Sequence, residues 1–161
     1  MEILQHSLKK IDKSPLNNFQ KEILEIITNL FEGLIIRKIS NDSIIDEKPY
    51  LDIIIRLKAS DFILNFSIRD DLFVLNSNYF DINIYPEIQF NLINLLIKEV
   101  LLGNYVITLS YGKFDKLIRK EIVFDNQELK EFNQMRKISL FVKKIRRYEK
   151  IQGIKLINSI A

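Results

Sequence analysis

The segment 103-GNYVITLSYGKFDKLIRKEIVF-124 decides the fold class, because both of its halves carry side chains that alternate along a strand. Residues with this period of two point to opposite faces of a strand. Gly112 and Asp115 lie between the halves, where a tight reversal favours glycine and aspartate. The segment therefore predicts an antiparallel hairpin. Each strand has one shared face, made of Tyr105, Ile107, Leu109 and Tyr111 in the first and of Ile118, Ile122 and Phe124 in the second.

Further strand patterns precede this hairpin. The segment 61–69 alternates clearly and predicts a half-buried antiparallel strand, with Asp70 and Asp71 as the turn that follows it. Residues 77–85 fit either a strand or an ordered loop, and residues 40–49 are expected to form a polar loop ended by Pro49. The other expected strands are residues 34–39, 50–57 and 72–76.

Three main helices are expected, at residues 15–32, 86–102 and 127–150, besides a short one within residues 2–13. Ser14 and Pro15 suit the start of the first, and Pro86 with Glu87 suits the start of the second. In the third, apolar residues recur every three or four positions from Leu129 to Tyr148, and Gly153 is expected to end it. The sequence predicts an α+β fold: a single domain, residues 1–161, with a mostly antiparallel β-sheet of about five to seven strands packed by three main helices.

Composition excludes several classes of chemistry. The 161 residues include no cysteine and one histidine, His6, which excludes disulfides, thiolate metal sites and multi-histidine zinc centres. The four glycines are isolated, so no phosphate-binding glycine loop is expected. We therefore expect no catalytic residues, no metal site and no cofactor. The N-terminus lacks a signal-peptide pattern and no apolar run reaches about 18 residues, so we expect a cytoplasmic protein without a membrane partner.

The net charge of +3 conceals an uneven distribution. Residues 126–161 carry nine Lys and Arg against three Glu, whereas residues 40–90 carry four cations against nine acids. An acidic middle is thus followed by a basic C-terminal segment.

The basic segment 141-FVKKIRRYEK-150 contains Lys143, Arg146 and Arg147 as candidate partner-binding residues. Its cations suit a solvated face of the expected last helix, a surface for an acidic protein, or contacts with nucleic acid phosphates. Nucleic acid is disfavoured, because the acidic middle of the chain would repel a polyanion.

Four acidic residues form the opposite candidate surface, for a basic partner. Ordinary solvated turns are the alternative interpretation, and adjacent carboxylates on an extended chain point apart, which argues against a paired catalytic site. These partner-binding candidates are Asp70, Asp71, Asp81 and Glu87.

The stretch 98-KEVLLGNYVITLSYGKFDKLIRKEIVFDN-126 resembles small immunity proteins of bacterial polymorphic toxin systems, in which a helix ends in a Gly-x-Tyr step and a hairpin follows. The resemblance covers the C-terminal third of the chain. It implies a non-enzymatic protein that binds and blocks one cognate toxin or effector protein, often by charge complementarity. The alternatives are a secretion or folding chaperone, a nucleic-acid-binding accessory protein and, last, an enzyme based on carboxylates.

Overall fold

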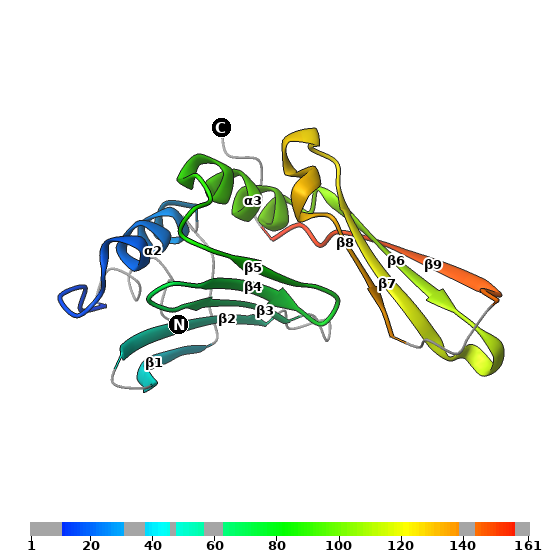
Figure 1. The fold of residues 1–161 in the computed structure, drawn as a ribbon, viewed down its shortest axis with the longest axis horizontal. Helices are drawn as coiled ribbons and strands as arrows, with labels where there is room; N and C mark the ends of the chain where they lie inside the picture. The colour runs from blue at the N-terminus through cyan, green and yellow to red at the C-terminus, as the bar shows by residue number, and fades with distance from the viewer. Residues whose placement is uncertain (1–10, 31–37, 46–47, 57–62, 139–143, 157–161) are drawn as a thin grey trace. The chain divides into compact units, whose positions relative to one another are not determined.

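The structure is a computed structural model that describes residues 11–30, 38–45, 48–56, 63–138 and 144–156 (Figure 1). Side chains are described for these residues except 38–45, 48–49 and 55–56. The chain divides into two compact units, residues 1–94 and 95–161, and each unit is described by itself. The expected single domain, residues 1–161, stays a prediction. His6 and most of the short helix expected within residues 2–13 lie outside the described residues.

The first unit contains the helix α2 (Asn18–Leu30) and a five-stranded antiparallel sheet, and α2 lies on one side of this sheet (Figure 1). Each strand pairs with the next along the chain, so the sheet order equals the sequence order. The strands are β1 (Lys38–Ile45), β2 (Lys48–Arg56), β3 (Ile63–Ile68), β4 (Phe73–Ser77) and β5 (Asp81–Ile84).

One face of this sheet supplies the core of the first unit. Alternate residues of the central strands are fully buried, as the period of two requires, and Phe66 stacks on Phe73 across the β3–β4 pair with ring centroids 6.1 Å apart. The helix α2 buries Phe19, Ile23 and Ile27 at helical spacing. The expected alternation of the segment 61–69 is confirmed within the described residues.

The start of α2 differs from the sequence-based prediction. Asn17, rather than Ser14, caps the helix, because its side-chain oxygen accepts a hydrogen bond of 2.9 Å from the Gln20 amide. The Gln20 side chain accepts one of the same length from the Asn17 amide, which completes a capping box. The Asn17 side chain also donates to the Asp70 carbonyl at 2.6 Å, so the helix start is tied to the turn between β3 and β4.

The second unit contains a four-stranded antiparallel sheet in the order β8-β7-β6-β9. The helix α3 (Phe90–Leu102) begins within residues 1–94, the first unit, and ends within residues 95–161, the second unit. The predicted hairpin is confirmed as β6 (Tyr105–Tyr111) and β7 (Leu117–Phe124), joined by the 3-10 turn η1 (Lys113–Asp115). The remaining elements are the 3-10 helix η2 (Gln127–Phe132), β8 (Gln134–Lys137) and β9 (Arg147–Gln152).

The helix predicted at residues 127–150 is wrong. Among the described residues of this range, only 127–132 are helical, as a 3-10 helix, and its cap residue Asn126 accepts a hydrogen bond from the Glu128 amide. The Asn133 side chain then accepts from the Phe124 amide at 2.9 Å, which fixes the chain beside β7 and starts β8. Backbone pairing with β7 and β6 thus overrides an apolar spacing that also fits a helix. Residues 139–143 lie outside the described residues.

Other boundaries also differ. The second helix begins at Phe90, and Pro86 and Glu87 lie in the turn before it. Residues 40–45 belong to β1, so the polar loop expected at 40–49 is wrong for these residues, and residues 81–84 form a strand. The α+β class with mostly antiparallel sheet is confirmed, but the described residues form nine strands in two sheets rather than one sheet of five to seven.

Two glycines allow the segment after β9 to lie against the start of β6. Gly103 has a φ of +75°, and a Cβ placed there would lie 2.7 Å from the Gly153 carbonyl oxygen. The Gly153 amide donates to the Tyr105 carbonyl at 2.7 Å, and the Leu156 amide donates to the Leu101 carbonyl at the same distance. Only residues without a side chain permit this approach, and it continues the pairing of β9 with β6.

Gly153→Ala is expected to lower the free energy of unfolding by about 1–3 kcal/mol, because the added methyl group would overlap the Gly103 backbone and the Tyr105 ring. Urea denaturation measures the change. Lys155→Ala, at an exposed position two residues away, is the control and should stay within about 0.5 kcal/mol of the unchanged protein. Equal stability of the two variants would contradict the close approach.

Candidate functional site

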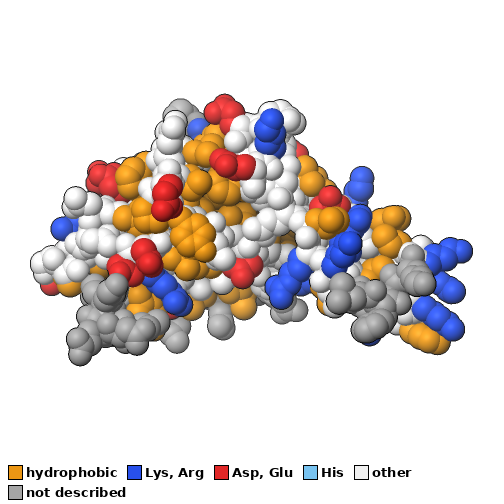
Figure 2. Space-filling view, in the orientation of Figure 1, with side chains coloured by type: hydrophobic (Ala, Val, Ile, Leu, Met, Phe, Trp, Pro, Cys, Tyr) orange, Lys and Arg blue, Asp and Glu red, His pale blue; other side chains and the backbone are white. Residues whose placement is uncertain are grey.

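The two units differ in charge. Residues 95–161 contain 14 Lys and Arg against 7 Asp and Glu, a net charge of +7, whereas residues 1–94 contain 10 against 14, a net charge of −4. Figure 2 shows Lys and Arg side chains gathered along the four-stranded sheet. The cationic surface predicted for the C-terminal segment is therefore carried by a sheet and not by a helix.

The sheet of the second unit has one apolar and one polar face. Tyr105, Ile107 and Ile122 are buried on the apolar face, where the rings of Tyr105 and Phe124 lie 6.1 Å apart. The opposite face, called the outer face here, is defined by the register of the strands. It carries Thr108, Ser110, Arg119, Glu121, Val123, Met135, Lys137, Tyr148 and Lys150.

Cations and exposed apolar side chains alternate on the outer face. Arg119 forms a 3.5 Å ion pair with Glu121 and lies 3.6 Å from the Met135 sulfur. Lys137 and Lys150 are exposed, and neither forms an ion pair with a residue that the structure describes. Tyr148 is 59% exposed and Met135 54%. The face thus combines free positive charge with accessible hydrophobic surface.

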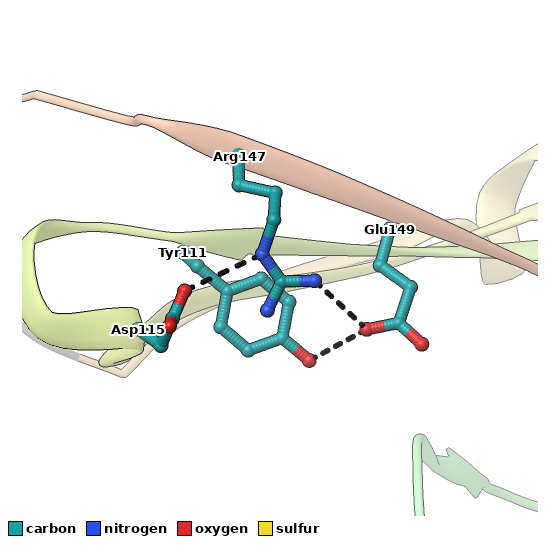
Figure 3. Close-up of polar contacts among 4 residues, drawn as sticks. All are labelled: Tyr111, Asp115, Arg147 and Glu149. Carbon is teal, nitrogen blue, oxygen red and sulfur yellow. Dashed lines mark hydrogen bonds and ion pairs between the residues drawn. The ribbon is translucent and has the colours of Figure 1, made fainter.

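A polar cluster links β9 to the end of the β6–β7 hairpin (Figure 3). The Arg147 guanidinium stacks over the Tyr111 ring at 4.1 Å from the centroid. It also forms ion pairs with Asp115 at 3.4 Å and with Glu149 at 3.7 Å. The Tyr111 hydroxyl donates to Glu149 at 2.9 Å. We call these four residues the tip cluster, because Asp115 belongs to the hairpin turn.

The tip cluster changes the acidity of Tyr111. Burial, and then the hydrogen bond to the Glu149 carboxylate and its negative charge, raise the pKa of Tyr111 above its ordinary value of 10.0; the Arg147 charge opposes this. The phenol is therefore protonated at neutral pH and serves as the hydrogen-bond donor in this contact.

The hairpin turn has an unusual backbone. Phe114 has φ 59° and ψ 34°, and Asp115 has a φ of 52°, so both are left-handed. Phe114 is also 88% exposed, and the Lys113 ammonium lies 4.8 Å from its ring centroid. The turn stays closed through hydrogen bonds from the Gly112 amide to the Lys116 carbonyl and from the Lys116 amide to the Lys113 carbonyl.

No family model, curated protein or solved structure matches this chain. Among the residues that the structure describes, no group of three His, Cys, Asp or Glu lies close enough to hold a metal ion. No helix in the described ranges has the length and apolar character needed to cross a membrane.

Two of the three predicted basic residues, Arg146 and Arg147, lie in the part of the chain that the structure describes. Lys143 lies outside the described residues. Arg146 is exposed just before β9, and its backbone amide donates to the Tyr111 carbonyl at 2.8 Å. Arg147 belongs to the tip cluster, on the side of the sheet opposite to Tyr148. The expected grouping on a helix is wrong, because neighbours on a strand point to opposite faces.

The predicted acidic residues are spread along the sheet of the first unit. Asp70 and the exposed Asp71 form the turn between β3 and β4. Asp81 begins β5 opposite Asn76, at the other end of β4 from that turn. Glu87 is exposed in the turn before α3. These four residues therefore do not form one compact acidic site.

Sequence reasoning missed the tip cluster and the exposed turn residue. Tyr111 was assigned to sheet packing, although it lies at the end of β6 where it contacts β9. The sequence around Phe114 contains no pattern that predicts an exposed ring, and a left-handed conformation is rare for an aromatic residue. The contacts of Asp115 and Tyr111 depend on the pairing of β9 with β6, which the expected helix excluded.

Arg147→Ala is expected to increase hydrogen exchange of the Gly112 and Lys116 amides by about 5-fold, because it removes the stack on Tyr111 and the ion pair to Asp115. The global free energy of unfolding should fall by less than about 1 kcal/mol, since these contacts are partly exposed. Exchange measured residue by residue tests this. Arg146→Ala is the matched control, and equal exchange in both variants would contradict a role of Arg147 at the tip.

The raised pKa of Tyr111 predicts a stability difference at alkaline pH. Its contribution is fully present below the ordinary pKa and is lost as the pH rises through the raised value. The stability of the unchanged protein relative to Tyr111→Phe should therefore stay constant from pH about 8 to just below pH 10 and fall as the pH rises above about 10. Urea denaturation across this range measures the loss. Tyr148→Phe, at an exposed position, should follow the unchanged protein, and parallel curves for all three proteins would show that the contact is not formed.

Proposed function

We propose that this chain is a non-enzymatic immunity protein that binds and blocks a cognate bacterial toxin or effector domain through charge-complementary contacts. The observation that carries the proposal is the outer face of the second unit, where two lysines that form no ion pair with a described residue lie beside exposed Tyr148 and Met135. Tyrosine, methionine and arginine are enriched where proteins bind one another, and charge complementarity supplies specificity and fast association.

The net charge of +7 in residues 95–161 favours an acidic partner for this surface. Lys137 and Lys150 form no ion pair with a described residue, so no described carboxylate competes with a partner for these two cations. A basic partner would instead meet the acidic residues of the first unit. Because those residues are dispersed, the outer face is the better supported docking surface. We expect the complex to form in the cytoplasm.

Nucleic acid binding is the second candidate, because a cationic sheet with exposed aromatic rings also suits a phosphate backbone and stacked bases. Several observations weigh against it. Glu121 lies in the middle of the outer face, opposite Thr108, and Asp115 and Glu149 flank Arg147 at the hairpin end. Glu121 would repel a continuous phosphate backbone laid across the face, whereas an acidic protein can place its carboxylates opposite single cations. A chaperone would need an apolar groove, and the exposed hydrophobic residues of the outer face are interspersed with charges.

The proposal predicts that the chain rescues cells that express the toxin domain encoded immediately upstream. The double reversal Lys137→Glu with Lys150→Glu should weaken the complex by at least about 10-fold, because it turns attraction into repulsion at the docking surface. Binding is measured by titration calorimetry with a catalytically inactive toxin domain, and rescue by colony counts.

The matched control is Asp71→Lys with Asp81→Lys, which alters two exposed acids of the first unit. This control should rescue as well as the unchanged protein. Failure of the unchanged protein to rescue would overturn the proposed function. Loss of rescue in the control alone would move the docking surface to the first unit. Retardation of nucleic acid that falls steeply with salt would favour the second candidate.

A further inference from the structure

The hairpin turn of the second unit exposes an aromatic ring at an energetic cost. Phe114 is 88% exposed and holds a left-handed conformation that glycine or asparagine would adopt more easily. An exposed Phe also forgoes the favourable burial of its ring. Neither feature contributes to the stability of the turn. Strained residues of this kind concentrate at binding sites.

The surrounding contacts fix the backbone of the turn that carries this ring. Asp115, the next residue, is paired with Arg147, which in turn stacks on Tyr111. Tyr111 is fixed by its hydrogen bond to Glu149 (Figure 3). The turn hydrogen bonds between Gly112 and Lys116 close the loop behind the ring. A side chain presented on an ordered turn loses less conformational entropy on binding than one on a mobile loop.

We propose that Phe114 is the anchor of the complex and enters an apolar pocket on the toxin domain, with acidic groups around the pocket. The proposal rests on the proposed function and specifies its contact. The Lys113 ammonium lies 4.8 Å from the ring centroid, and Lys113 and Lys116 outnumber Asp115 in the turn, so a pocket rim of carboxylates would complement its net positive charge. Aromatic anchors that fill pockets carry a large share of the binding energy in protein complexes.

A protein pocket fits the turn better than a lipid surface does. Phe114 is the only apolar residue among 112–116, and membrane attachment requires a larger apolar area together with basic residues. A concave protein site accommodates a single ring and excludes water around it.

The test compares binding of the inactive upstream-encoded toxin domain by four proteins. Phe114→Ala should raise the Kd by about 30- to 100-fold relative to the unchanged chain, because the pocket loses its occupant. Tyr85→Ala, which removes an exposed aromatic side chain of the first unit, is the control and should change the Kd by less than about 3-fold.

Phe114→Gly separates binding from folding. Glycine relieves the left-handed backbone, so this variant should unfold at a higher urea concentration than Phe114→Ala while binding equally weakly. Unchanged binding by Phe114→Ala, with tight binding by the unchanged chain, would overturn the anchor and leave the proposed function intact. Absence of binding by the unchanged chain would overturn both. Cosedimentation with vesicles of phosphatidylcholine and phosphatidylserine that is lost in Phe114→Ala would overturn the pocket in favour of a lipid surface.

Discussion

The close approach of Gly103 and Gly153 is the constraint on which the second unit depends. Without side chains at these positions, the backbone after β9 lies against the start of β6, and the Gly153 amide reaches the Tyr105 carbonyl. This contact sets the register in which Arg147 lies opposite Tyr111. A contact at one end of the sheet thereby determines which side chains meet at the other end, where the hairpin turn is.

The stability of the fold and the conformation of the hairpin turn rest on different parts of this sheet. Burial of Tyr105, Ile107 and Ile122 removes apolar surface from water and supplies the larger free energy. The contacts of Arg147 are partly exposed and add little to the global free energy. Their effect is local: they limit the conformations of the turn. The buried residues thus hold the sheet rigid. The contacts of Arg147 contribute little to the free energy of unfolding but shape the turn.

The sequence predicted what depends on local patterns. The hairpin of β6 and β7 follows from alternation around a turn, and both strands were recognised. The segment after Phe132 was misread, because apolar residues at Met135, Ile138 and Tyr148 fit a helix by spacing alone. The segment instead pairs with β7 and β6, which are formed by other parts of the chain. Such long-range pairing cannot be predicted from the residues of a short segment alone.

For the candidate site, too, local composition could be predicted from the sequence, whereas the orientation of side chains could not. The excess of positive charge was visible in composition, and Arg146 and Arg147 were identified as partner-binding candidates. Their orientation was not, since a helix would place them together and a strand separates them. Phe114 could not be found in advance, because its exposure depends on the turn conformation and on the contact between Asp115 and Arg147.

The placement of β9 at one edge of its sheet and β8 at the other has a consequence for solubility. Edge strands offer unsatisfied backbone groups to other chains and can seed aggregation, and charged side chains there oppose it. β9 carries Arg147, Glu149 and Lys150, and β8 carries Arg136 and Lys137. Four of these five side chains are cationic, so two copies that aligned these edges would bring mostly positive charges together. The residues that favour an acidic partner therefore also discourage self-assembly into extended sheets.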